Sequence, residues 1–331
     1  MPEFRQNMAT KEWVVIATER AKRPEDFLKG KEARPELPAY SPTCPFCPGN
    51  EGKTPPSVLT MEEDGTWKLR VVPNKFAALQ PQFSTKRERV GRFLKADGFG
   101  IAEVIIETPA HNATIATMDG HDVQRVVEAY KSRQVAISQD PRINMVTVFR
   151  NHGPKAGTSL EHPHSQIIAT PIIPPHVRSP MTQATLAFDT YGSCVFCDMI
   201  GEELRQSERV IIETEHFVAL CPFASRSPFE TRILPKRHNS SFTTISDVEI
   251  EDLARVLKTL LRKIYVGLDN PDYNYIIRSA PTTDEDVRFY HWYILIVLKL
   301  TTPAGFEIGS VIYINTTYPE QCAAFLRDVS I

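Results

Sequence analysis

Two stretches of the chain carry apolar residues at the three- and four-residue spacing of an amphipathic helix. The first places Val123, Val126, Val127 and Tyr130 on one face. The second places five apolar residues on one face, Ile250, Leu253, Leu257, Leu261 and Ile264. Ser246 and Glu249 precede this second stretch with the spacing of a capping box, which marks a helix start. The pattern predicts one helix in each half of the chain.

Short apolar runs typical of strands surround both helices in the same order. Before the helices, "VIIETPAH" ends at His111 and "TRILPKRH" ends at His238. After them come "INMVTVFRN" and "YNYIIRSA", then "HPHSQIIATP" and "HWYILIVLKL". His111 and His162 are 51 residues apart, and His238 and His291 are 53 apart. This matching spacing predicts two copies of one α+β module.

The boundary between the copies is predicted within residues 171–190. The segment "PIIPPHVRSP" in this range has the proline content of a linker. We therefore expect an N-terminal module at residues 1–180 and a C-terminal module at residues 181–331.

Composition narrows the class of protein. The chain has 331 residues, 42% hydrophobic and 24% charged, which is ordinary for a globular protein. Its net charge of −2 and its lack of a long basic run argue against nucleic acid as a partner. The first residues lack the apolar stretch of a signal peptide, and the longest apolar run is too short for a membrane span. We expect a cytoplasmic enzyme without a membrane partner.

Four of the six cysteines form two Cys-x-x-Cys pairs, Cys44/Cys47 and Cys194/Cys197. In a reducing compartment such a pair is typical of a metal site or a redox pair. Both pairs have loop-like flanks, and neither precedes a clear helix of thioredoxin type, so zinc is the favoured interpretation. Cys221 and Cys322 stand alone and are expected to be small core residues.

Each half offers two cysteines and two histidines, enough to close a tetrahedral, structural zinc site. The two sets are Cys44, Cys47, His111 and His162, and Cys194, Cys197, His238 and His291. A lone His-x-His could instead bind one catalytic metal through both rings. The repeated set favours structural sites, which leaves His164 unbound. On a strand, His162, His164 and Gln166 would share one face.

The second copy lacks this arrangement, because Tyr293 and Leu295 stand where the first copy has His164 and Gln166. We expect the second copy to keep the fold without the nucleophile. Four other histidines have no such partners and are expected in loops or on the surface: His121, His152, His176 and His216.

An unbound, neutral imidazole can attack phosphorus when its other nitrogen donates its proton to an acceptor. A backbone carbonyl near His162 could be that acceptor, and Gln166 could donate to a phosphoryl oxygen. The segment "GPKAGTS" includes Gly157, Thr158 and Ser159 and is suited to contacting phosphate. Arg20 and Arg23 could pair with phosphates or could form a solvated turn.

The motifs "RAKRP", "CPFC", "NKF", "FRNHG", "HPHSQ" and "GFEIG", in this order, resemble the galactose-1-phosphate uridylyltransferase family of the histidine-triad superfamily. The resemblance covers nearly the whole chain. It implies two histidine-triad modules, each an antiparallel sheet with packed helices, in a homodimer with active sites near the interface. It also implies ping-pong exchange of UMP between UDP-glucose and galactose 1-phosphate.

By this resemblance, His164 is the nucleophile, Gln166 the phosphate-stabilising glutamine and Ser159 a phosphate-contacting serine. The other positions that it implies in substrate binding are Arg20, Arg23, Asn74, Asn151, Gly157, Thr158, Phe306 and Gly309.

Some positions depart from the family pattern. Certain members hold iron in the second half through a glutamate and three histidines, but here Pro180 and Tyr293 stand in two of those places. A second zinc is therefore expected instead of iron. Thr158 stands where other members have cysteine, and the segment "AGFEIGSVIYIN" lacks the lysine and the glutamate that the better-known branch of the family has there. This variation resembles the plant ADP-glucose phosphorylases.

We expect UDP-glucose to be the better donor, because the N-terminal motifs fit the uridylyltransferase branch most fully. An ADP-sugar or dinucleotide phosphorylase is the alternative. A zinc-knuckle scaffold without catalysis is a third hypothesis. It does not explain why only the first copy has His164 and Gln166.

Overall fold

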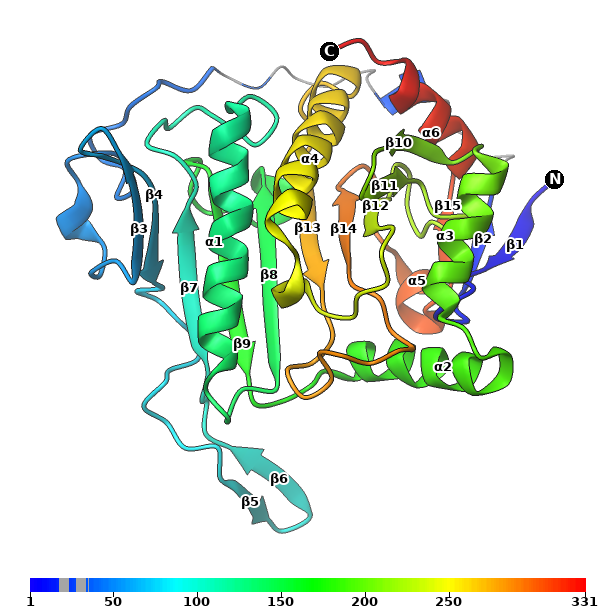
Figure 1. Cartoon of the computed structure of the whole chain (residues 1–331), viewed down its shortest axis with the longest axis horizontal. Helices are drawn as coiled ribbons and strands as arrows, with labels where there is room; N and C mark the ends of the chain where they lie inside the picture. Colours follow the sequence, from blue (N-terminus) through cyan, green and yellow to red (C-terminus); the bar gives the residue numbers. More distant parts are fainter. Residues whose placement is uncertain (18–23, 28–33, 35) are drawn as a thin grey trace.

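A single ten-stranded sheet runs through both halves of the protein in the computed structural model (Figure 1). The model describes residues 1–17, 24–27, 34 and 36–331. The strand order is β10-β11-β12-β14-β13-β8-β9-β7-β4-β3. Neighbouring strands in this sheet are antiparallel. The first half of the chain supplies β3 (Leu59–Glu63), β4 (Thr66–Pro73), β7 (Ile101–Ile106), β8 (Met145–His152) and β9 (His164–Thr170). The second half supplies β10 (Val210–Glu213), β11 (Phe217–Leu220), β12 (Thr231–Pro235), β13 (Tyr273–Arg278) and β14 (Tyr293–Leu298).

The halves meet where β8 pairs with β13, with Tyr273 opposite His152 and Ile277 opposite Val148. On either side of this junction the strands follow in corresponding order, so β9 matches β14 and β7 matches β12. The prediction of two α+β modules with antiparallel sheets is confirmed, and the modules share one sheet.

The two predicted helices, α1 (Gly120–Ser138) and α4 (Asp247–Gly267), lie side by side on one face of the sheet (Figure 1). Their buried residues include all of the apolar positions named from the sequence. Asp119 caps α1 by accepting a hydrogen bond from the His121 amide at 2.8 Å. The capping box of Ser246 and Glu249 begins α4 as predicted. These helices bury the apolar side of both modules in one core.

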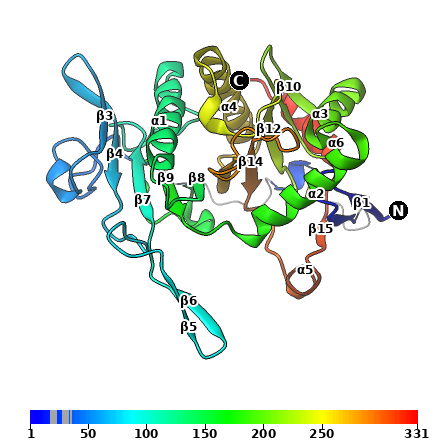
Figure 2. The same cartoon turned by 60° about the horizontal axis from the view of Figure 1, so that its bottom comes forward.

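The opposite face of the second half is covered by α2 (Pro175–Tyr191) and α3 (Val195–Gln206) (Figure 2). The prediction of a linker is therefore wrong for part of this segment, because Pro174 is the N-cap of α2 and the residues from Pro175 onward are helical. Pro175 fits the first helical turn, where its missing N–H has no partner to lose, and Pro180 interrupts only one bond. The expectation of loop-like flanks also fails for the second cysteine pair, since Cys194 is the N-cap of α3.

The N-terminal strands lie with the second half of the chain. β1 (Glu3–Gln6) pairs with β2 (Trp13–Ile16), which pairs in parallel with β15 (Tyr313–Asn315). The boundary at residue 180 stays a prediction, and this small sheet shows that residues from the first half pack onto the second. Among the described residues, no helix is long and apolar enough to cross a membrane.

The remaining elements are short. A hairpin of β5 (Arg87–Val90) and β6 (Phe93–Ala96) projects from the first half (Figures 1 and 2). α5 (Gly305–Ser310) and α6 (Pro319–Asp328) follow β14. Short 3-10 helices cover Pro24–Phe27, Glu51–Lys53, Pro154–Ala156 and Phe242–Thr244.

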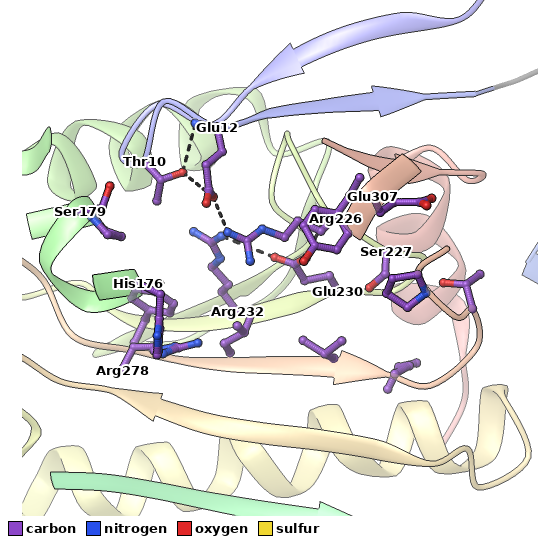
Figure 3. A pocket seen from close by; sticks show the side chains of 18 of the residues that line it. Thr10, Glu12, His176, Ser179, Arg226, Ser227, Glu230, Arg232, Arg278 and Glu307 are labelled. Carbon is purple, nitrogen blue, oxygen red and sulfur yellow. Dashed lines mark hydrogen bonds and ion pairs between the residues drawn. The ribbon is translucent and has the colours of Figure 1, made fainter. Parts of the chain in front are cut away.

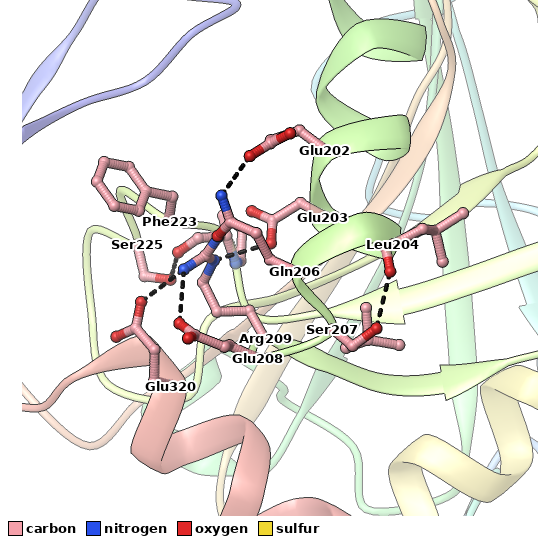
Figure 4. A network of polar contacts seen from close by, with 12 residues as sticks. Glu202, Glu203, Leu204, Gln206, Ser207, Glu208, Arg209, Phe223, Ser225 and Glu320 are labelled. Atoms are coloured by element: carbon pink, nitrogen blue, oxygen red, sulfur yellow. Dashed lines mark hydrogen bonds and ion pairs between the residues drawn. The ribbon is translucent and has the colours of Figure 1, made fainter.

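A buried arginine ties α3 to α6 and the N-terminus (Figure 4). Arg209 donates to Glu203 of α3 at 2.8 Å and to Glu320 of α6 at 2.8 Å. Glu320 also accepts a bond from Arg5 of β1 at 2.8 Å. Because the Arg209 and Glu203 side chains are almost fully buried, each requires the other as a partner.

Candidate active site and metal centres

The first predicted ligand set converges at one end of β9. Cys44 and Cys47 come from a loop, His111 follows β7, and His162 directly precedes β9. Their ligand atoms all lie within 4.8 Å of one another, and all four residues are buried. The sheet pairing of β7 with β9 brings the two histidines together from positions 51 residues apart.

The distances between ligand atoms fit a zinc ion. Cys47 Sγ lies 3.5 Å from His111 Nδ1 and 3.6 Å from His162 Nδ1, and the two Nδ1 atoms are 3.3 Å apart. Zinc bond lengths place tetrahedral nitrogen and sulfur ligands about 3.3–3.8 Å apart. His162 Nε2 donates to the Thr108 carbonyl at 2.8 Å, so Nδ1 keeps its lone pair for a metal. Burial lowers the pKa of His162 to about 4, which keeps the ring neutral.

The second ligand set forms a matching cluster. Cys197 Sγ lies 3.3 Å from His238 Nδ1 and 3.7 Å from His291 Nδ1. His291 Nε2 donates to the Pro235 carbonyl at 2.8 Å, as His162 does to Thr108. A hydrogen bond with Cys197 lowers the pKa of the Cys194 thiol to about 4, which favours the thiolate that binds metals. The protein thus has two Cys2His2 clusters that could each hold a metal.

The two clusters differ in exposure. The four residues of the first are all buried, whereas His238 is exposed and Cys197 is partly exposed in the second. Solvent and chelators can therefore reach the second cluster more easily.

His164 is the first residue of β9 and belongs to neither cluster. Its Nδ1 donates to the carbonyl of His162 at 2.8 Å, which is the acceptor expected from the sequence. The neutral ring therefore carries its lone pair on Nε2. Burial lowers the pKa of His164 from its ordinary value, with the His162 carbonyl opposing this shift. Phe46 packs on the imidazole at 5.5 Å between ring centroids.

Gln166 lies two residues further along β9 and so shares a face with His164. Ser165 and Ile167, which alternate with His164 and Gln166 along the strand, point toward the helices. His164 and Gln166 therefore lie on the face opposite to the one that α1 covers. Phe149 of β8 is the cross-strand neighbour of Gln166. Gln166 is only partly buried, so its amide is available to a molecule bound on this face.

The loop after β8 lies close to Asn151. Asn151 Oδ1 accepts a hydrogen bond from Asn274 of β13 at 2.7 Å, and Asn274 also donates to the Ala156 carbonyl at 2.9 Å. A Cβ built on Gly157 would lie 3.9 Å from Asn151 Nδ2, and the positive φ of 87° at Gly157 favours glycine. The structure therefore brings Asn151 and Gly157 together.

Thr158 and Ser159 continue the same loop. Thr158 Oγ1 donates to the Leu160 carbonyl at 3.3 Å, so this hydroxyl is partly occupied in stabilising the loop. Ser159 is exposed and is free to contact a bound molecule.

Asn74 follows β4, and its backbone N–H donates to the Ala102 carbonyl at 2.9 Å. Ala102 is paired with Ile168 of β9, four residues beyond His164. Asn74 thus lies on the same sheet as His164 but further along the strand direction. A molecule that contacts both would extend along the sheet.

Other expected site residues are not brought to this place. Phe306 and Gly309 lie on α5, which both views place with the second half and apart from β9 (Figures 1 and 2). Arg20 and Arg23 lie outside the described residues.

A buried polar network beneath β9 was missed by the sequence analysis. Glu107 accepts hydrogen bonds from Arg150 at 3.0 Å and from Ser165, and Tyr130 contacts Ser165 at 2.5 Å. Tyr130 also contacts Tyr275 of β13. The signal was present as polar residues at inward positions of apolar runs, in "VIIET", "FRN" and "HSQ". The network lies directly behind His164 and fixes the strand that carries it.

His152 departs from the expectation of a loop or surface residue. It is the last residue of β8, its ring stacks on Tyr273 at 4.7 Å, and its Nε2 donates to Asn270 Oδ1 at 2.7 Å. Burial and the nearby Arg150 lower the pKa of His152 to about 3. The histidine is therefore neutral and part of the polar network.

Comparison with protein families matches both halves of the chain. The description "Galactose-1-phosphate uridyl transferase, N-terminal domain" matches residues 1–174, and the corresponding C-terminal domain matches residues 181–329.

Two relatives match over the full chain. An ADP-glucose phosphorylase of Arabidopsis thaliana is 38% identical over 336 residues, which cover 100% of this chain and 93% of the relative. A galactose-1-phosphate uridylyltransferase of Thermotoga maritima is 30% identical over 343 residues, 100% of this chain and 99% of the relative.

Solved structures agree with this assignment. The crystal structure of an ADP-glucose phosphorylase from Arabidopsis thaliana with bound ADP-glucose superposes with a TM-score of 0.85 and 36% identity, and 100% of each chain is covered. A uridylyltransferase structure has a TM-score of 0.76 and 25% identity, with 99% of this chain and 98% of the other covered.

Proposed function

The chain belongs to the galactose-1-phosphate uridyl transferase family, and from that premise we propose that it transfers a nucleotidyl group by way of His164. The observation that carries this proposal is the hydrogen bond from His164 Nδ1 to the His162 carbonyl at 2.8 Å. This bond directs the lone pair of the neutral ring to Nε2. The family is one of nucleotidyltransferases, so the scaffold hypothesis is set aside.

In the first step, Nε2 attacks the α-phosphorus of a nucleoside diphosphate hexose. A new N–P bond forms as the P–O bond to the hexose 1-phosphate breaks, and the hexose 1-phosphate leaves with that electron pair. The Nδ1 proton stays in its hydrogen bond to the His162 carbonyl, which disperses the positive charge that develops on the ring. In the second step an acceptor phosphate oxygen attacks phosphorus and releases the imidazole.

Gln166 and the loop after β8 support this reaction. The Gln166 amide can donate to a phosphoryl oxygen as negative charge builds up in the transition state. Asn151, Gly157, Thr158 and Ser159 offer amide, backbone and hydroxyl donors at the neighbouring end of β8. Asn74 lies further along the sheet, where the nucleoside would extend.

We propose that both Cys2His2 clusters bind zinc. Zinc in the first cluster supplies a structural tie that holds His162 in place. Because the carbonyl of His162 positions His164, this tie also fixes the tautomer of the nucleophile.

For the donor, we propose ADP-hexose with inorganic phosphate as acceptor. The support is the 38% identity to an ADP-glucose phosphorylase, against 30% to a galactose-1-phosphate uridylyltransferase, each over the full chain. The sequence-based expectation, UDP-glucose with galactose 1-phosphate, stays the second candidate because both family domains match that enzyme.

A substrate panel distinguishes these candidates. Purified protein is given ADP-glucose or UDP-glucose, each with inorganic phosphate or galactose 1-phosphate, and kcat/KM is measured for all four pairs. We expect ADP-glucose with phosphate to exceed the other pairs by at least about tenfold. A preference for UDP-glucose with galactose 1-phosphate would reinstate the second candidate.

The covalent mechanism has its own test. Labelled glucose 1-phosphate should exchange into the nucleotide sugar with no acceptor present, because the two half-reactions are independent. His164→Ala should lower this exchange at least about a thousandfold while leaving zinc content intact. His162→Ala serves as the matched variant and should lose zinc and stability. Loss of zinc from His164→Ala to the same degree would make both histidines ligands and the mechanism wrong.

We also propose that the protein acts as a homodimer in which α5 of one subunit reaches the partner's first-half site. The support is that Phe306 and Gly309, expected at the hexose end, lie apart from His164 within one chain.

A further inference from the structure

A cavity of ≈ 350 Å³ lies over the second half of the sheet and contains neither His164 nor Gln166 (Figure 3). Its floor includes Tyr293 and Leu295 of β14, the residues that replace His164 and Gln166 in the second copy. The cavity therefore occupies, in the second half, the place that the nucleophile's face occupies in the first. α2, the loop around Arg226 and the segment after β14 form its walls.

Cationic residues flank these two replaced positions. Gln166 has Val104 as its neighbour on β7, whereas Leu295 has Arg232 as its neighbour on β12. Tyr293 is paired with Arg278 of β13. The second copy has thus lost the nucleophile but presents two guanidinium groups on the same face.

The carboxylates around the cavity already have partners. Glu12 is paired with Arg226. Glu230 accepts from the Arg226 amide at 2.8 Å and lies 3.5 Å from Arg232. Glu307 caps α5 by accepting from the Ala304 amide at 3.0 Å. Two of these three carboxylates are therefore paired with arginines, and four cationic side chains line the same cavity, Arg226, Arg232, Arg278 and Lys299.

Several cationic groups remain available. Arg232 is 6% exposed, yet its Nε and Nη1 have no hydrogen-bond partner among the described residues. Within the described part of the chain, the side chains of Arg278 and Lys299 also form no hydrogen bond or ion pair, and both line the cavity. A buried guanidinium N–H without a hydrogen-bond partner is destabilising unless a ligand or water accepts from it. The arrangement favours a bound anion.

The rest of the lining is apolar and aromatic. Val177, Leu295 and Val297 contribute aliphatic surface, and Tyr290 and Tyr293 contribute rings. Pockets of about 300–1,000 Å³ with apolar walls and a few convergent polar groups are typical of small-molecule sites. Such walls suit an organic group attached to the anion.

We propose that this cavity is a second, non-catalytic ligand site that binds a small organic phosphate, a phosphate monoester on a sugar or a nucleoside. The phosphate group lies against Arg232 and Arg278, whose cross-strand partners Leu295 and Tyr293 are two residues apart on β14. The organic group lies against the two tyrosines and the aliphatic wall, and Lys299 lies further along, just after the end of β14. Arginine recognises phosphate through several charge-assisted hydrogen bonds, which would satisfy the unpaired nitrogens of Arg232.

The test measures binding of labelled AMP, glucose 1-phosphate and inorganic phosphate to the zinc-loaded, full-length protein by equilibrium dialysis. In Arg278→Gln, the dissociation constant for AMP or glucose 1-phosphate should rise at least about tenfold at one site per chain. Arg178→Gln is the matched control, because Arg178 is an exposed arginine on α2 that does not line the cavity. His164→Ala should still bind ligand at the site that Arg278→Gln weakens, which would show that this site differs from the first-half site.

Arg232→Met gives an independent measurement. It should weaken the same binding, because it removes two donors, Nε and Nη1, that have no hydrogen-bond partner among the described residues. Identical isotherms for wild type, Arg278→Gln and Arg178→Gln would overturn the proposal, as would unchanged binding by Arg232→Met. Binding of inorganic phosphate as tightly as of both esters would overturn the assignment of an organic ligand.

Discussion

His164 shows how one backbone atom can set the chemistry of a side chain. The His162 carbonyl accepts the Nδ1 proton at 2.8 Å, which leaves Nε2 as the basic nitrogen. His162 is itself held by its contacts with Cys47 and the Thr108 carbonyl. In the second copy, His291 repeats the bond to a carbonyl, but Tyr293 follows it, so the same backbone geometry positions no nucleophile.

His152 should make stability fall in mild acid. Its pKa is lowered to about 3 in the folded protein, against about 6.5 when unfolded. Between these values the unfolded chain binds a proton that the folded protein does not, so the free energy of unfolding falls as pH falls. The loss is at most about 1.4 kcal/mol per pH unit below pH 6.5. Urea unfolding at pH 7.5, 6.5 and 5.5 measures it.

His152→Gln should flatten this dependence by roughly 1 kcal/mol between pH 6.5 and 5.5, because glutamine does not titrate. His121→Gln is the control, since His121 is exposed at the start of α1. Equal slopes for wild type and His152→Gln would show that this histidine does not contribute.

At the scale of elements, each Cys2His2 cluster brings a cysteine-bearing segment to the ends of two paired strands. The first joins a cysteine loop to the ends of β7 and β9, and the second joins α3 to the ends of β12 and β14. The buried Arg209 network adds a third tie, between α3, α6 and β1. These ties act where the sheet ends and backbone pairing no longer holds the chain.

The two metals should differ in lability. Elemental analysis should find two zinc ions per chain, and a chelator should remove the second-half ion first, because His238 is exposed and Cys197 partly exposed. Cys197→Ser should retain only the zinc of the first half, and Cys47→Ser should retain only the zinc of the second half. Simultaneous release of both ions from the wild type would contradict this order.

Removing Arg209 should destabilise the second half. Arg209→Met leaves the carboxylate of Glu203 buried without its partner, which costs about 3–5 kcal/mol in the free energy of unfolding. Arg205→Met is the matched control, since Arg205 pairs with Glu202 on the exposed side of α3 and should cost less than about 1 kcal/mol. Chemical denaturation measures the free energy of unfolding of both variants. Equal losses would show that the buried Arg209 contributes no more than the exposed Arg205.

At the scale of the whole molecule, both modules share one sheet, but they differ on the face opposite to α1 and α4. The first half presents His164 and Gln166 there, whereas the second half covers much of its face with α2 and α3 and leaves a cationic cavity. α5 extends from the second half with its Phe306 51% and Ile308 74% exposed, and Val311, which caps its C-terminal end, is 57% exposed. This apolar surface suits contact with another subunit.

Ile308→Asp should disrupt the proposed dimer and lower nucleotidyl transfer at least about tenfold, because a charge would be buried at the interface. Sedimentation equilibrium measures the mass, and exchange of labelled glucose 1-phosphate measures the activity. Val248→Asp, at an exposed valine of α4, should leave both unchanged. An Ile308→Asp protein that stays dimeric and fully active would exclude α5 from the interface.

The sequence determined much of this fold because its signals are local or repeated. Helical spacing located α1 and α4, and the capping box located the start of α4. Both clusters were predicted because a Cys-x-x-Cys pair recurs in each half, followed by two histidines at nearly equal intervals of 51 and 53 residues. The same repeat isolated His164 as the histidine outside the ligand sets.

Only the tertiary structure decided the features that depend on contacts between distant strands. The pairing of β8 with β13, which makes one sheet of two modules, follows from backbone hydrogen bonds that any two apolar strands can form. The same pairing places Tyr275 against Tyr130 and so completes the network behind His164. Register also decides that Arg232 flanks Leu295, and burial then leaves two of its guanidinium nitrogens, Nε and Nη1, without a hydrogen-bond partner among the described residues. A residue's own sequence neighbours carry no record of which side chain lies across the sheet, because that depends on how the folded strands are aligned.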